Sequence, residues 1–202
     1  MFYEIHYDMD KIDERALIGK QYIYAEKNNF SELDLKYSFK GGFRYSIVQP
    51  SLDIIWPNVK FYYSSKVSSL ESDYLLNTSR WPLVHKRVKE TFEKEGIKGV
   101  RFYPIVLVDV VTNVENINYF VMYIENFLEA YDMDKSKFRY LEKYNAYVFI
   151  PKCTFLSRHI CDKHDIFRCS QNVSCIYISE KLYEIIVRKK FSGFKFNAIP
   201  EC

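Results

Sequence analysis

Two histidines and two cysteines close together late in the chain have the clearest chemical potential. They are His159, Cys161, His164 and Cys169, in the pattern H-x-C-x2-H-x4-C. Imidazole and thiolate groups are the usual ligands of structural zinc. The spacing differs from that of zinc fingers and ribbons, and the residues between His164 and Cys169 have the pattern of a strand. We therefore predict that these four side chains hold no metal ion.

A cysteine nucleophile with a histidine base is a second chemical option. Cys161 could pair with His164 or with His85, but such pairs are formed by the fold and not by sequence spacing. None of the five cysteines lies in a protease signature, and their odd number favours free thiols over a disulfide framework. We interpret them as buried free cysteines.

The carboxylates, the other histidine and the glycines form no catalytic signature. His6 is interpreted as a surface or hydrogen-bonded residue, and Gly41-Gly42 as a turn, because it lacks the lysine and hydroxyl residue of a phosphate loop. The scattered acidic residues, interpreted as solvated surface charges, are Glu14, Glu26, Glu32, Asp34, Asp53, Glu71 and Asp73. The sequence therefore predicts no catalytic, cofactor-binding or metal-binding residue.

The composition predicts a globular protein with a large aromatic core. Of the 202 residues, 48% are apolar and 18% aromatic, with 16 Phe and 18 Tyr, enough for one domain or two closely joined ones. This content favours β-rich cores, and tyrosine also suits a binding face. The net charge of +3 is too balanced for a dedicated nucleic-acid binder.

The sequence shows no targeting or membrane segment. Met1–Asp8 alternates like a strand and lacks the charged and apolar regions of a signal peptide. The longest apolar run, Ile105–Val111, is interrupted by Asp109 and is too short to cross a bilayer. We therefore expect a soluble, cytoplasmic protein with no membrane partner.

Residues 1–78 are predicted to form a β-rich N-terminal portion. Apolar alternation between turn residues predicts several strands, which are Phe2–Tyr7, Gln21–Ala25, Phe43–Val48 and Val59–Tyr63. Ile54–Trp56 is predicted to form a buried cluster. Ser69 is predicted to cap a short helix that runs through Leu76. The serine-rich stretch 64–79 is the best boundary to a second portion, residues 79–202, although one continuous domain is an alternative.

Two segments of the second portion repeat one pattern at an offset of 94 positions. The first segment, Leu83–Ile105, aligns without a gap on the second segment, Tyr177–Ile199, and places Gly99 on Gly193. Each predicts an amphipathic helix, a glycine turn and a short strand of alternating aromatic and basic residues. Because each glycine joins a helix to a strand, we predict backbone geometry that favours glycine at both.

Capping residues and strand patterns complete the expected fold. For the first helix, residues 77–79 offer an N-cap and Pro82 stands in the first turn; Ser179 caps the second. The other expected elements are strands at Val100–Val111, Asn118–Ile124, Ala146–Ile150, Asp165–Arg168, Cys175–Ile178 and Phe194–Ile199, with a short helix and a loop within Phe127–Lys143. We predict an α+β fold with a mostly antiparallel sheet and two repeated strand–helix–strand units.

Several short motifs of the second portion resemble bacterial immunity proteins of polymorphic toxin systems. These motifs are Trp81–Val84 entering a helix, Gly99–Ile105, Asp165–Arg168, Ile176–Glu180 followed by Leu182, and Gly193–Phe196. The resemblance is to the eleventh and forty-third immunity families and covers about residues 80–200. It implies a cytoplasmic inhibitor that neutralises a cognate toxin domain by stoichiometric binding, without catalysis or cofactor.

Two other functions remain as alternatives. An enzyme would build its site from scattered residues and would show a concave pocket with convergent polar groups. An RNA-binding sheet would expose aromatics among basic residues, and the only candidates are Arg101-Phe102 and Lys195-Phe196. We rank RNA binding third, because the aromatic half of such an alternation faces the core in a one-sided sheet.

Overall fold

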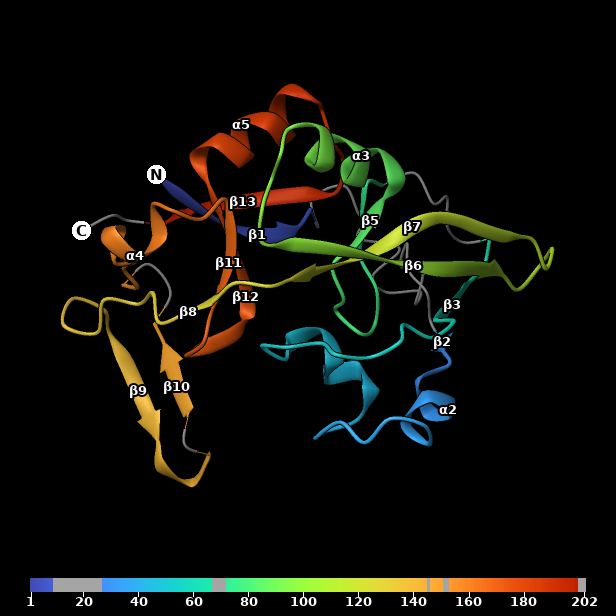
Figure 1. Cartoon of the computed structure of the whole chain (residues 1–202), viewed down its shortest axis with the longest axis horizontal. Helices are drawn as coiled ribbons and strands as arrows, with labels where there is room; N and C mark the ends of the chain where they lie inside the picture. The colour runs from blue at the N-terminus through green and yellow to red at the C-terminus, as the bar shows by residue number, and fades with distance from the viewer. Residues whose placement is uncertain (9–26, 67–71, 145, 151–152, 200–202) are drawn as a thin grey trace.

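Two larger β-sheets, a separate two-stranded hairpin and short helices form the structure (Figure 1). The computed structural model describes residues 1–8, 27–66, 72–144, 146–150 and 153–199. In spatial order, the five-stranded sheet contains β13 (Phe194–Ile199), β1 (Phe2–Tyr7), β12 (Asn172–Ser179), β11 (Ile166–Cys169) and β8 (Phe127–Leu128). The six-stranded sheet contains β2 (Lys27–Asn28), β3 (Lys60–Tyr63), β6 (Val100–Asp109), β7 (Glu115–Ile124), β5 (Leu83–His85) and β4 (Tyr74–Leu75).

The remaining elements lie outside these sheets. The hairpin consists of β9 (Phe138–Leu141) and β10 (Ala146–Phe149), and the α-helices are α2 (Phe30–Asp34), α3 (Lys86–Lys94), α4 (Arg158–Cys161) and α5 (Glu180–Arg188). Short 3₁₀ helices span Phe43–Val48 and Glu142–Tyr144. Most strand pairs are antiparallel, whereas β3–β6 and β8–β11 are parallel. The structure is therefore of the predicted α+β class.

The helices of the two segments begin and end 94 positions apart, and so do the end of the strand before each helix and the start of the strand after it. Helices α3 and α5 each have nine residues, and each follows directly on a strand, β5 or β12. In the six-stranded sheet, β7 lies between β5 and β6 and is antiparallel to both. In the five-stranded sheet, β1 takes the same place between β12 and β13. The N-terminal strand thus lies inside a sheet made otherwise of C-terminal residues.

The two helices are capped differently. The Ser179 hydroxyl accepts a hydrogen bond from the Leu182 amide at 3.3 Å, which confirms the predicted cap of α5. The predicted cap of the first helix at residues 77–79 is wrong: α3 is capped by the His85 ring, which accepts from the Arg87 amide at 3.3 Å. The reason is that residues 83–85 pair with β7 as a strand, so the helix begins only after them.

Gly99 and Gly193 both have left-handed backbone geometry, as predicted. Their φ angles are +82° and +83°, a region that residues with a Cβ rarely adopt. A Cβ at Gly193 would also collide with the backbone carbonyl oxygen of Tyr74, whereas at Gly99 it would meet the side-chain amide of Asn126. Both glycines are therefore required by the turns that they form.

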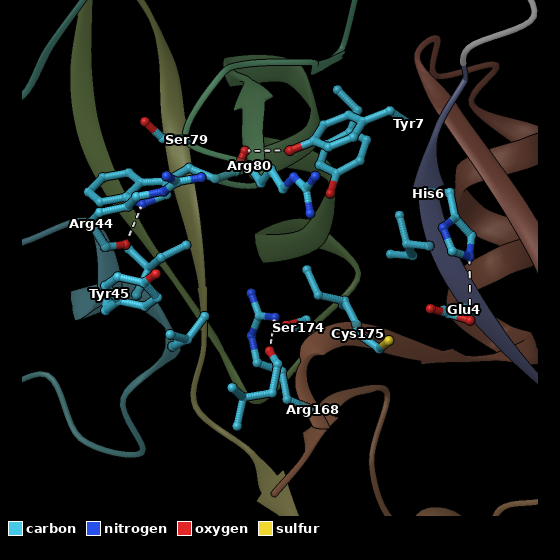
Figure 2. Close-up of a pocket in the computed structure, with 17 residues that line it drawn as sticks. Glu4, His6, Tyr7, Arg44, Tyr45, Ser79, Arg80, Arg168, Ser174 and Cys175 are labelled. Carbon is cyan, nitrogen blue, oxygen red and sulfur yellow. Dashed lines mark hydrogen bonds and ion pairs between the residues drawn. The ribbon is translucent and has the colours of Figure 1, made fainter. Parts of the chain in front are cut away.

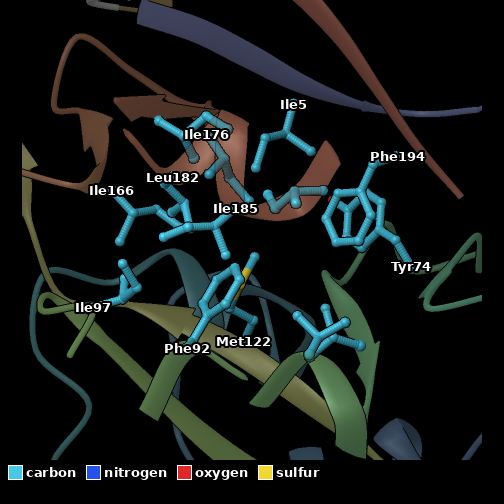
Figure 3. Close-up of a cluster of buried hydrophobic side chains, with 14 of the residues drawn as sticks. Ile5, Tyr74, Phe92, Ile97, Met122, Ile166, Ile176, Leu182, Ile185 and Phe194 are labelled. Atoms are coloured by element: carbon cyan, nitrogen blue, oxygen red, sulfur yellow. The ribbon is translucent and has the colours of Figure 1, made fainter. Parts of the chain in front are cut away.

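One buried cluster joins the two sheets and their helices (Figure 3). Phe92 and Ile97 reach it from the first segment, and Leu182 and Ile185 from the second. A second cluster, rich in aromatic rings, lies around Phe43, Phe61 and Trp81, and a third contains Phe2, Phe167 and Tyr177 on the other face of the five-stranded sheet. None of the helices that the structure describes is long and apolar enough to cross a membrane.

Several expected elements of the N-terminal portion differ in the structure. Phe43–Val48 is a 3₁₀ helix and not a strand, because its backbone hydrogen bonds form within the segment. This conformation places the side chains of Phe43 and Ile47 in the same buried cluster. Ile55 is 90% exposed and does not belong to the expected buried cluster. Residues 74–75 of the expected helix are strand β4, since they pair with β5; residues 67–71 and the expected strand Gln21–Ala25 lie outside the described residues.

The segment Phe127–Lys143 also differs from expectation. It contains β8, β9 and the start of a 3₁₀ helix, and no α-helix. Its two strands find partners far along the chain, β11 for β8 and β10 for β9. Tertiary pairing thus overrides the mixed local pattern from which the helix was expected.

Candidate functional site

The histidines and cysteines of the H-x-C-x2-H-x4-C pattern lie in different environments in the structure. Cys161 and Cys169 are buried in the third cluster, whereas His159 is exposed on α4, with its Nδ1 2.8 Å from the Ser157 hydroxyl. Burial raises the pKa of the Cys161 thiol to about 12, so this thiol is protonated at neutral pH. Across the described residues, no three His, Cys, Asp or Glu side chains form a group that could hold a metal ion.

One predicted surface carboxylate is instead a buried structural residue. Asp73 is 2% exposed, and its carboxylate pairs with Arg87 and accepts hydrogen bonds from the amide and hydroxyl of Ser192, at 2.7 and 2.9 Å. It therefore ties β4 to the turn that precedes β13. The interpretation of Asp73 as a solvated charge is wrong, since its partners lie far along the chain. Glu14, Glu26 and Glu71 lie outside the described residues.

The hairpin β9–β10 carries an exposed aromatic face. It stands apart from both sheets in Figure 1. Its register places Tyr140 opposite Tyr147 and Phe138 opposite Phe149, so that the four rings share one face. Tyr147 lies 5.1 Å from Tyr140 and 5.2 Å from Phe138 between ring centroids. Phe138, Tyr140 and Tyr147 are 36%, 44% and 37% exposed. We call this surface the aromatic hairpin.

The base of the aromatic hairpin is anchored in the core. The Phe149 ring lies 4.0 Å from that of Tyr131, whose hydroxyl is 2.6 Å from the hydroxyl of Tyr177. Tyr131 and Tyr177 are buried, and burial raises the pKa of both phenols well above the usual range, so they stay neutral. The rings therefore form a series that begins in the third cluster and ends at the exposed tip.

A second feature is a cavity of about 420 Å³ that three arginines line (Figure 2). Arg44 comes from the 3₁₀ helix Phe43–Val48, Arg80 from the turn before β5, and Arg168 from β11. Figure 2 shows Arg80 and Arg168 reaching into the space from opposite sides. We call this space the arginine cavity.

The arginine cavity opens where two strands separate. Strand β1 pairs with β12 only from Phe2 to Glu4, although it continues to pair with β13 as far as Tyr7. Beyond Glu4, β1 and β12 therefore diverge, and His6 and Cys175 line the gap. On the other side, the Tyr7 hydroxyl donates to the Trp81 carbonyl at 2.8 Å and closes the wall.

Arg168 is the most unusual residue of the cavity. Its side chain is buried, with the residue 2% exposed, and Nη1 donates to the Val173 carbonyl at 2.5 Å. Its Nε has no partner among the residues that the structure describes. Burial lowers the pKa of the guanidinium to about 10, so Arg168 still carries its charge at neutral pH. Sequence reasoning missed Arg168, because it lies in an ordinary strand pattern.

Two further titratable groups, Glu4 and Cys175, lie together in the wall of the cavity. Glu4 Oε2 lies 3.4 Å from His6 Nε2; burial acts to raise the pKa of Glu4, but hydrogen bonds with His6 and Cys175 outweigh it and lower the pKa. Burial and the Glu4 contact raise the pKa of the Cys175 thiol to about 12. At neutral pH, these two residues supply neither a carboxylic acid nor a thiolate.

The basic–aromatic strands do not form an exposed aromatic platform. Phe102 and Phe196 pack against the first cluster, as a one-sided sheet predicts. Arg101 pairs with Glu125 at 2.5 Å on the solvent side. These residues therefore contribute mainly to folding.

Comparison with known protein families identifies the class of protein to which this fold belongs. A model of immunity proteins matches residues 2–201, essentially the whole chain. The chain therefore belongs to this family, the Immunity protein family (Imm11). The match includes the first 78 residues, in which the motifs gave no resemblance. No curated protein matches the chain.

Proposed function

We propose that this protein neutralises a cognate bacterial toxin domain by stoichiometric binding in the cytoplasm of the cell that makes it. Membership of the immunity protein family supports this role. The Cys175 thiol in the arginine cavity also supports binding over turnover, because its raised pKa keeps it protonated at neutral pH and it supplies no thiolate nucleophile. No cofactor is needed for such an inhibitor.

The observation that carries the proposal is the aromatic hairpin. Exposed Tyr and Phe side chains on a rigid element are typical anchors of tight interfaces, because they bury a large area at a small cost in conformational entropy. Charged residues alternate with the rings along the hairpin and follow them at its turn: Lys137, Arg139 and Glu142 are exposed. We infer that the toxin domain packs its surface against Phe138, Tyr140 and Tyr147.

Co-expression with the toxin domain encoded beside this gene tests the proposal. Rescue of growth and a one-to-one complex on gel filtration are the expected results. Rescue by strongly substoichiometric amounts of the protein would show turnover and contradict it.

Single variants then test the binding surface. Tyr140→Ala and Tyr147→Ala should each weaken binding about tenfold or more, because each removes a central ring. Ile117→Ala is the matched control, since Ile117 is also exposed, on β7 and outside the hairpin. Equal affinities of all three variants would place the binding surface elsewhere.

We also propose that the two segments are copies of one strand–helix–strand unit within a single continuous domain. The equal spacing of their elements, the equivalent places of β7 and β1, and the shared core support this. Superposing Leu83–Ile105 on Tyr177–Ile199 should bring both the helices and the strands together. Helices that point in unrelated directions from their strands would refute the repeat.

A further inference from the structure

The arginine cavity contains more positive charge than its surroundings balance. Arg168 is buried, and an isolated buried charge is strongly unfavourable unless it is paired and fully hydrogen-bonded. Within the described part of the chain, the only acidic residue that lines the cavity is Glu4, which lies against His6 and Cys175. Arg44 donates to the Thr78 carbonyl at 3.3 Å, and neither it nor Arg80 has an ion-pair partner among the described residues.

The backbone at the cavity mouth carries a second sign of a binding site. Arg80 has a φ of +56°, one of few residues other than glycine with left-handed geometry in the described chain. Such geometry is unfavourable for a residue with a Cβ and recurs at ligand clamps, where the surrounding structure holds it. Here the Asn77 side chain holds the turn, because it accepts from the Trp81 amide at 3.0 Å and donates to the Trp81 carbonyl at 2.6 Å.

The chemistry of the cavity specifies an anion. Guanidinium groups form paired hydrogen bonds with carboxylates or phosphates, and these bonds strengthen when water is excluded. At the mouth, Arg44, Arg80 and Tyr45 are exposed. Arginine and tyrosine are the residue types enriched at the centres of protein interfaces. The mouth is therefore suited to a partner protein that covers it and excludes water.

We propose that the arginine cavity receives an acidic side chain, Asp or Glu, of the toxin domain, whose carboxylate pairs with Arg80 and Arg168. This inference rests on the proposed function and adds a second contact to the aromatic hairpin. The carboxylate supplies a negative charge to balance the buried guanidinium of Arg168, and the Nε of Arg168 gains a hydrogen-bond acceptor. The toxin domain closes the mouth over Arg44 and Tyr45.

The test measures the affinity of the full-length chain for the toxin domain. The variant Arg80→Gly removes one guanidinium and also relieves the left-handed backbone, so it should fold. The matched control is Lys190→Gly, because Lys190 is exposed, has a φ of +53° and carries the same charge. We expect Arg80→Gly to raise Kd by on the order of 30-fold and Lys190→Gly by less than about twofold.

Acidic residues of the toxin domain provide the second arm. Each Asp or Glu on its surface is changed to Asn or Gln, and the substitution that weakens binding to the wild-type chain but not to Arg80→Gly identifies the inserted side chain. Equal affinities of the Arg80→Gly and Lys190→Gly variants, with wild-type binding intact, would overturn this inference and leave the proposed function standing. Absence of any wild-type complex would overturn the proposed function itself.

Inorganic phosphate distinguishes a free anion from the toxin carboxylate. If millimolar phosphate raises the Tm of the wild-type chain but not of Arg80→Gly, while no acidic residue of the toxin couples to Arg80, the cavity binds a free anion and the toxin-carboxylate inference is wrong. If phosphate instead competes with the toxin domain and one acidic toxin residue couples to Arg80, both results support the inference.

Discussion

The first segment with β7 and the second segment with β1 have strands in corresponding places but differ in the side chains around them. Trp81 lies just before the first segment, and Cys175 is at the corresponding position 94 residues later, just before the second segment. At the same offset, Tyr74 of β4 corresponds to Arg168 of β11. Trp81 is 1% exposed and fills the aromatic second cluster, with its indole N–H donating to the Arg44 carbonyl at 2.9 Å. Cys175 is much smaller; both residues line the arginine cavity, Cys175 in the gap between β1 and β12 and Trp81 on the opposite wall.

This difference in side-chain size accounts for a closely packed wall at Trp81 and an open gap at Cys175. A large side chain at one position completes a core, whereas a small one near the corresponding position leaves space that a charged residue can occupy. The central strands differ as well, since β7 follows β6 directly whereas β1 comes from the N-terminus. The second segment therefore depends on a contact between the two ends of the chain, and its splayed strands form the cavity wall.

The largest expected difference between the segments is at their glycine turns. Gly193→Ala should destabilise the protein by about 3 kcal/mol or more, because it combines left-handed strain with a collision against the rigid Tyr74 carbonyl. Gly99→Ala should cost about 2 kcal/mol, because the Asn126 side chain that it meets can move. Urea unfolding of both variants measures the difference. A smaller loss at Gly193 than at Gly99 would contradict this account of the turns.

The next effect concerns Asp73, which ties the two sheets together. Burial acts to raise the pKa of Asp73, but hydrogen bonds from Arg87 and Ser192 outweigh it and lower the pKa. A lowered pKa means that the folded state binds the proton less tightly, so the stabilisation exists above the unfolded pKa of about 3.9 and is lost as pH falls through the folded value.

Asp73→Asn should therefore cost about 1 to 3 kcal/mol at pH 7 and should flatten the decline in stability below about pH 4. Unfolding by urea at several pH values measures both effects. Asp165→Asn is the comparison next to the second segment: this carboxylate, just before β11, contacts the exposed Lys181 of α5 at 3.2 Å, and we expect a smaller effect. Identical pH profiles of wild type and Asp73→Asn would show that this carboxylate does not contribute as inferred.

A smaller difference is expected at the helix caps. Ser179→Ala should cost about 1 kcal/mol, because the Leu182 amide loses its acceptor. His85→Ala should lower the free energy of unfolding by about 0.5 kcal/mol, because the ring accepts only one hydrogen bond, from the Arg87 amide, and this bond is exposed to solvent. Urea unfolding of the two variants at pH 7 compares the caps, and a larger loss at His85 than at Ser179 would contradict this account.

The smallest expected effect is on the stability of the cavity mouth. Arg80→Gly should raise the free energy of unfolding by about 0.5 kcal/mol, because relief of the left-handed strain slightly exceeds the added entropy of the unfolded chain. A clear loss of stability would mean that the Arg80 side chain supports the fold. Its proposed role in binding would then depend on the Kd measurement alone. Lys190→Gly should behave alike, since its backbone geometry is similar.

Local pattern was enough for the elements whose own residues decide their conformation. Phe194–Ile199, the Ser179 cap and the turns at Gly99 and Gly193 were predicted correctly, because alternation, a hydroxyl acceptor and a missing Cβ act within a few residues. The predictions failed where partners lie far along the chain. The first helix begins at Lys86 because residues 83–85 pair with β7 as a strand. Likewise, β9 is a strand because β10 pairs with it.

The sequence by itself determined the class of fold, the offset of 94 positions between two segments and the resemblance to immunity proteins. These features could be predicted because periodicity, turn residues and motifs depend on residues that are close together in the chain. Only the tertiary structure decided that β1 lies between β12 and β13, that four aromatic rings share one face of a hairpin, and that Arg44, Arg80 and Arg168 line one cavity. Those arrangements depend on which strands pair and where two strands diverge, and pairing energies between distant residues leave no local pattern in the chain.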